Sequence, residues 1–173
     1  MLPKDWLKQF LVSRQIGRPD GQPLYRYRLS DSDFETLKTA LKTSALFGVA
    51  NITEVAGWKA VFVIYAAEWW RREYEGSLWS WEKVFSSFNA DAKSLTTARR
   101  NLVVESGLRY WGRKVRTING SSRYLGSIAI EGGLPLNQLN NSSGWLGRVF
   151  KQVIPKYTRL QHTGIYADNL TLF

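Results

Sequence analysis

The hydrophobic pattern of the chain is most pronounced between residues 56 and 76, AGWKAVFVIYAAEWWRREYEG. The middle of this stretch, residues 60–67, is apolar at every position, and its end places two tryptophans beside two arginines. Glycines lie near both ends, with no glycine or proline between them, which predicts one uninterrupted helix of about five turns. A helix that is apolar on all sides must be enclosed on all sides. We therefore expect the other segments to pack around it.

Two helices are predicted before this central one. Residues 5–13 carry apolar side chains at helical spacing, and residues 30–47 do so again. Ser32 and Glu35 have the spacing of a capping box, which predicts where the second helix begins. Between the two, residues 24–29 alternate apolar and basic side chains, a pattern typical of a short strand or an extended arm.

Two more helices are predicted after the central one, at residues 80–88 and 94–106, joined by a polar turn. Ser94 is expected to cap the second of them, and Gly107 to end it. Its apolar face is expected to consist of Leu95, Ala98 and Leu102.

The period then changes from helical to alternating. Residues 110–118 and 123–130 alternate around an Asn119-Gly120 turn, the strongest short signal for a β-hairpin. Residues 144–154 predict a final amphipathic helix.

These elements predict an α+β fold that is mostly helical, with a central buried helix at 56–76 and a winged-helix-like helix-helix-β-hairpin unit at about 80–131. We expect a single domain over residues 1–160. Its parts are an N-terminal helical part (1–76), the winged-helix-like part (77–131) and the C-terminal helix (144–154), followed by a tail (161–173) interpreted as the truncated end of a longer protein.

The charge is distributed unevenly. The 173 residues carry a net charge of +10, with 12 Lys and Arg against 10 Asp and Glu in residues 1–85, but 12 against four in residues 86–173. A polyanionic partner is therefore expected to meet the second half of the chain.

The sequence offers no catalytic or metal-binding constellation. There is no cysteine, and His162 is the only histidine, with no acidic cluster near it, so neither a metal site nor a catalytic triad is predicted. A D-x-K sequence at residues 91–93, with Asp20 upstream, resembles half of a nuclease site, but it follows a helix and turn rather than a buried strand. We expect no cofactor. The uncharged run of the central helix is far shorter than the ~20 residues that a bilayer requires, so no membrane partner is expected. The absence of cysteine fits a reducing compartment, and a cytoplasmic protein is expected.

In a winged helix, the second helix enters the major groove of DNA and the hairpin contacts the backbone or the minor groove. The predicted nucleic-acid contacts are Thr96, Thr97, Arg99, Arg100 and Asn101 on the helix, and Arg113, Lys114, Arg116 and Arg123 on the hairpin. The alternatives are a solvated basic face and a protein-docking module that uses the aromatic residues near 69–81 with Arg71 and Arg72. A single-strand stacking platform at the same aromatic residues is a further alternative, although core packing is favoured there.

The segments AAEWWRREYEGSLWSWEKVF (66–85), SGLRYWGRKV (106–115) and RYLGSIAIEGGLPL (123–136) resemble the N-terminal region of a family of large bacterial proteins. Members of that family are encoded in genomic islands beside a very large helicase, in Druantia-type antiphage defence. These segments are not catalytic motifs, so the resemblance implies no functional residue.

The resemblance implies a role in phage resistance with a helicase partner and DNA. Together with the charge, it predicts a non-catalytic DNA-binding module of a bacterial antiphage defence protein, with a docking module in the same complex as the alternative. RNA as the ligand and the oligomeric state stay open.

Overall fold

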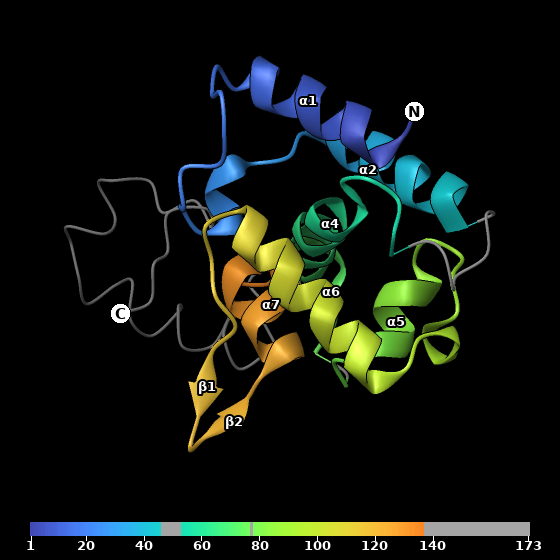
Figure 1. The fold of residues 1–173 in the computed structure, drawn as a ribbon, viewed down its shortest axis with the longest axis vertical. Coiled ribbons are helices and arrows are strands. Elements are labelled where there is room, and N and C mark those ends of the chain that lie inside the picture. Colours follow the sequence, from blue (N-terminus) through green and yellow to red (C-terminus); the bar gives the residue numbers. More distant parts are fainter. Residues whose placement is uncertain (46–52, 77, 137–173) are drawn as a thin grey trace.

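The fold is mostly helical with a small antiparallel hairpin, which confirms the predicted α+β class. A computed structural model describes residues 1–45, 53–76 and 78–136 (Figure 1). Its elements are α1 (Pro3–Ser13), the 3₁₀ turn η1 (Leu24–Tyr27), α2 (Asp31–Ala45), α4 (Trp58–Glu73), α5 (Trp81–Ser86), the 3₁₀ turn η2 (Ala92–Ser94), α6 (Thr97–Tyr110), β1 (Thr117–Ile118), β2 (Ser121–Ser122) and α7 (Tyr124–Gly132). The helix predicted at 144–154 and the tail at 161–173 lie outside the described residues.

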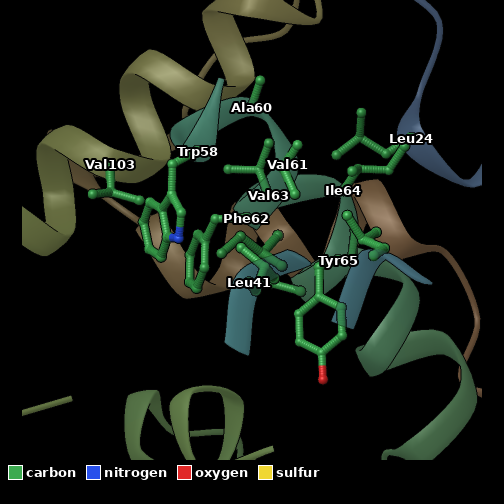
Figure 2. Packing of buried hydrophobic residues seen from close by; sticks show 14 of the residues in the cluster. Leu24, Leu41, Trp58, Ala60, Val61, Phe62, Val63, Ile64, Tyr65 and Val103 are labelled. Carbon is green, nitrogen blue, oxygen red and sulfur yellow. The ribbon is translucent and has the colours of Figure 1, made fainter. Parts of the chain in front are cut away.

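Helix α4 is the centre of the molecule, as the sequence predicts. Every residue from Ala60 to Glu68 is buried, and α1, α2, α6, α7 and η1 all contact this helix. Figure 2 shows its side chains reaching toward Leu24 of η1, Leu41 of α2 and Val103 of α6, which lie on different sides of it. The aromatic and branched side chains of one helix therefore hold the surrounding elements together.

Helix α6 does not end at Gly107, contrary to the prediction. It continues to Tyr110, and the missing side chain of Gly107 instead lets α6 approach α4 closely. A Cβ atom at this position would lie 2.3 Å from the carbonyl oxygen of Lys59 and 2.6 Å from Cγ1 of Val63. The predicted apolar face is wrong at Ala98 and Leu102, which are exposed, whereas Leu95 is buried as expected. The side chains that α6 and its C-cap bury are Val103, Val104, Leu108 and Trp111.

The predicted helix starts are displaced. A reciprocal pair caps α2 two residues before the expected one: the Ser30 hydroxyl accepts from the Asp33 amide at 3.0 Å, and the Asp33 carboxylate accepts from the Ser30 amide at 3.1 Å. Helix α6 is capped by Thr96, whose hydroxyl accepts from the Arg99 amide at 3.3 Å. Ser94 instead ends η2.

The strands are also shorter than predicted, and residues 24–27 form a 3₁₀ turn rather than a strand. The hairpin has two residues in each strand, pairing Thr117 with Ser122 and Ile118 with Ser121. Residues 123–130, expected as a strand, lie almost entirely in helix α7. The predicted turn is confirmed: Asn119 and Gly120 both have left-handed backbones, with φ of 49° and 75°.

Replacing Gly107 by alanine should destabilise the protein, although alanine is the better helix former by about 1 kcal/mol. The added methyl group would overlap the backbone of α4 at Lys59, and overpacking of this kind costs about 1–3 kcal/mol. Gly126→Ala in α7 is the matched control, because the nearest atom to its Cβ is 3.4 Å away, on Arg123. Urea unfolding should show a lower midpoint for Gly107→Ala alone. Equal midpoints would contradict the close approach of α6 to α4.

Candidate nucleic-acid interface

The β1–β2 hairpin projects from the helical body (Figure 1). All residues from Thr117 to Ser122 are exposed, and no other atom lies within 4 Å of a Cβ built on Gly120. At the base of the hairpin, the Arg123 amide donates to the Arg116 carbonyl at 2.8 Å. The hydroxyl of Ser127, in α7, accepts from the Arg116 amide at 2.8 Å and donates to the Arg123 carbonyl at 2.6 Å. The hairpin is therefore anchored at its base by α7 while its tip is in solvent.

Three of the predicted contact residues, Lys114, Arg116 and Arg123, are exposed at the base of this hairpin. Among the described residues, no carboxylate forms an ion pair with any of them. Residues 86–136 contain eight Lys and Arg but three Asp and Glu. Two of those three acids are already paired, Glu105 with Arg109 and Glu131 with Arg113. The local surplus of positive charge is thus concentrated where the chain is exposed.

Arg113, by contrast, points into the fold. Its guanidinium donates from Nε to both carboxylate oxygens of Glu131, at 2.9 and 3.0 Å, and from Nη1 to the Gly21 carbonyl at 3.0 Å. The buried Glu131 carboxylate also accepts from the Leu24 amide at 3.2 Å. The predicted hairpin contact Arg113 is therefore an internal link between the chain at residues 21–24, the end of α6 and α7.

The predicted contacts at the start of α6 divide in the same way. Thr96, Thr97 and Arg99 are exposed, whereas Arg100 is half-buried. The Arg100 guanidinium lies 5.7 Å from the ring centroid of Trp81, and its Nη2 donates to the Thr97 hydroxyl at 3.2 Å. In Figure 1 this end of α6 and the hairpin both lie toward the lower end of the view. Asn101, the remaining predicted contact, is half-buried.

The charge of Arg100 is one of the causes that lower the pKa of Glu82. The pKa of Glu82 is lowered, first by a hydrogen bond with its own backbone amide and then by the Ser80 hydroxyl, with the charges of Arg100 and Lys93 adding to the effect. Arg100 therefore has the Trp81 ring and the Thr97 hydroxyl as partners, and it is less exposed than Arg116.

The aromatic residues at the end of α4 pack against the core, in agreement with the core interpretation. Trp69 and Trp79 stack at 5.6 Å between ring centroids, and the indole nitrogen of Trp79 donates to the Leu125 carbonyl at 2.9 Å. The neighbouring Arg71 and Arg72 form ion pairs with the buried carboxylate of Glu68. The indole of Trp70 likewise donates to the Gly133 carbonyl at 2.9 Å.

The residues considered for a nuclease site have local structural partners. The Asp91 carboxylate accepts from the Lys93 amide at 2.9 Å and so caps η2. Asp20 accepts from the Tyr27 hydroxyl at 2.6 Å, which lowers the pKa of Asp20, while burial and this carboxylate raise the pKa of Tyr27 to about 12. Within residues 1–45, 53–76 and 78–136, no three His, Cys, Asp or Glu side chains are grouped so that they could hold a metal ion. His162 lies outside that part of the chain.

The sequence that forms this fold is similar to a known protein family. Residues 2–134 match the YjiT N-terminal domain. The chain belongs to the YjiT N-terminal domain family. It is 30% identical over 168 residues to the protein YjiT of Escherichia coli strain K12, a match that covers 95% of this chain and 31% of that relative. The chain thus spans about a third of the length of the curated relative. No solved structure matches the chain.

The family match covers α1 to α7, including the hairpin and every exposed cation named above. None of the helices in the described part of the chain is long and apolar enough to cross a membrane.

Replacing Arg113 by alanine should destabilise the fold by about 2–4 kcal/mol, because it leaves the buried Glu131 carboxylate without its ionic partner. Lys114→Ala, one residue further along and exposed, should change stability by less than about 0.5 kcal/mol. Urea unfolding of the two variants at neutral pH measures the difference. Similar stabilities would show that Arg113 does not act as a structural link.

Proposed function

We propose that this YjiT N-terminal domain binds duplex DNA through the basic hairpin, defined as Lys114, Arg116 and Arg123 with the strands between them, assisted by Thr96, Thr97 and Arg99 at the start of α6. The observation that carries the proposal is the exposure of the three hairpin cations without a carboxylate partner among the described residues. Exposed cations are stable in water, and these three are grouped on one hairpin where an external anion can contact them together. Their position therefore favours an external anion.

The charge of the hairpin suits a nucleic acid better than a small anion. Its cations lie before and after the Asn119-Gly120 turn, on both sides of the ribbon, so several of them can contact phosphates of one duplex at once. Such contacts release counterions from the DNA and give an affinity that falls steeply with salt. The hydroxyls of Thr96 and Thr97 add neutral donors that can contact phosphate oxygens.

The proposal is for a binding role without catalysis in a longer protein. Because the chain covers about a third of its curated relative, any activity of the whole protein would depend on the rest of it. The resemblance to the Druantia-type genomic-island family suggests antiphage defence as the setting, with a large helicase acting on the same DNA.

A protein-docking role is the second candidate, and one exposed apolar residue favours it. Leu78 is 80% exposed beside the half-buried Trp79. Arg71 and Arg72 contribute less to such a surface than expected, because both pair with Glu68. Binding to a partner protein through this region should be insensitive to salt and should be lost in Leu78→Glu but retained in Arg116→Ala.

DNA binding should weaken steeply with salt, and each hairpin cation should contribute to the slope. Fluorescence anisotropy with a labelled duplex at several salt concentrations should give a log–log slope that falls by about 0.9 for each phosphate contact removed. We expect Lys114→Ala, Arg116→Ala and Arg123→Ala each to flatten the slope in this way.

Lys8→Ala is the matched control for charge. Lys8 is exposed on α1, which lies at the opposite end of the view in Figure 1 from the hairpin. This variant should keep the wild-type slope. A wild-type domain that fails to bind duplex DNA at low salt, or hairpin variants that behave like Lys8→Ala, would refute the proposed function.

A further inference from the structure

The tip of the basic hairpin carries an apolar side chain that the fold does not use. Ile118 is 52% exposed, directly before the Asn119-Gly120 turn. Its partner across the hairpin is Ser121, which is small and also exposed, so no apolar neighbour on the opposite strand covers it. Every other residue from Thr117 to Ser122 is polar or glycine. Ile118 is therefore the only large apolar side chain of residues 117–122, and it is exposed next to the turn.

The pairing register places this isoleucine on the same face as two cations. Successive side chains of a strand alternate between faces, so Arg116 and Ile118 share one face and Thr117 lies on the other. Arg123 lies opposite Arg116, since its amide donates to the Arg116 carbonyl at 2.8 Å in continuation of the strand pairing. One face of the hairpin thus carries an apolar tip with a guanidinium on each strand behind it.

This face suits the minor groove of B-DNA when the ribbon lies over the groove with the face turned toward it. The groove is about 6 Å wide, too narrow for the whole ribbon but wide enough for a single side chain. Because strand side chains stand perpendicular to the sheet, Ile118 then points at the base-pair edges. The two longer arginine side chains, about 6.6 Å away along the strands, point at the phosphates on either side. Isoleucine is one of the side chains that proteins insert between base steps from the minor groove.

We propose that the hairpin acts as a wedge: Ile118 inserts between base pairs from the minor groove while Arg116 and Arg123 hold the flanking phosphates, so that the domain bends duplex DNA. This inference rests on the proposed function and adds to it the mode of binding. The preferred ligand is a duplex that unstacks easily, such as one with a pyrimidine–purine step or a mismatch, since the cost of opening the step is then lower.

The test uses a duplex of about 25 base pairs, with dyes at both ends and 2-aminopurine at a central TA step. Binding of the wild-type protein should raise the energy transfer between the ends and the 2-aminopurine fluorescence, and a central mismatch should tighten binding by about tenfold. Ile118→Thr keeps a β-branched side chain and so preserves the hairpin, but replaces the apolar tip by a polar one. It should lose the bending, the unstacking and the preference for the mismatch while keeping the salt slope.

Two controls separate this inference from the proposed function. Ile118→Val should bend DNA as the wild type does, and Val12→Thr, which makes a similar change at a 68%-exposed position on α1, should have no effect. Salt-dependent binding of wild type without bending, or equal bending by Ile118→Thr, would overturn the wedge and leave DNA binding standing. No binding of any duplex by the wild-type protein would overturn both.

Discussion

The structure depends on two close approaches to the backbone of α4. Gly107 of α6 and Gly132 of α7 lie against its carbonyl groups, so that a Cβ atom would come within 2.3 Å of the Lys59 oxygen and 2.4 Å of the Ala67 oxygen. These carbonyls are separated by eight residues, a little over two helical turns. Side chains larger than hydrogen would push either helix outward and open the core, because protein interiors are close-packed and transmit such strain.

Helix positions set in this way determine where the hairpin lies. The hairpin connects the end of α6 to the start of α7, and its base is fixed by Ser127 of α7. The ion pair of Arg113 and Glu131 joins the same two helices to the chain at Gly21. A short ribbon, which is marginal alone, is therefore presented by a rigid support. The support explains why a few cations there can form a defined surface rather than a mobile arm.

The central helix and its role could be predicted because an apolar run without glycine or proline has one good solution. The Asn119-Gly120 turn was predictable for a similarly local reason. The end of α6 could not be predicted. A glycine after an apolar helical run is typical of a helix end, but Gly107 is needed here because it packs against the carbonyl of Lys59, 48 residues away in sequence. The strand predicted at residues 123–130 was wrong for a different reason: a short apolar run fits a strand or a buried helix equally well.

The sequence also does not tell which of the basic residues of the candidate site are exposed. Arg113 and Arg116 are indistinguishable in sequence, yet one pairs with the buried Glu131 and the other is exposed. What separates them is the position of α7, which brings a carboxylate to the end of α6 but none to the hairpin. An excess of Lys and Arg in one half of a chain therefore indicates a basic surface. Which residues belong to that surface follows only from the packing. In this protein the packing leaves Arg116 and Arg123 exposed on opposite sides of one ribbon, with Ile118 exposed between them and the turn.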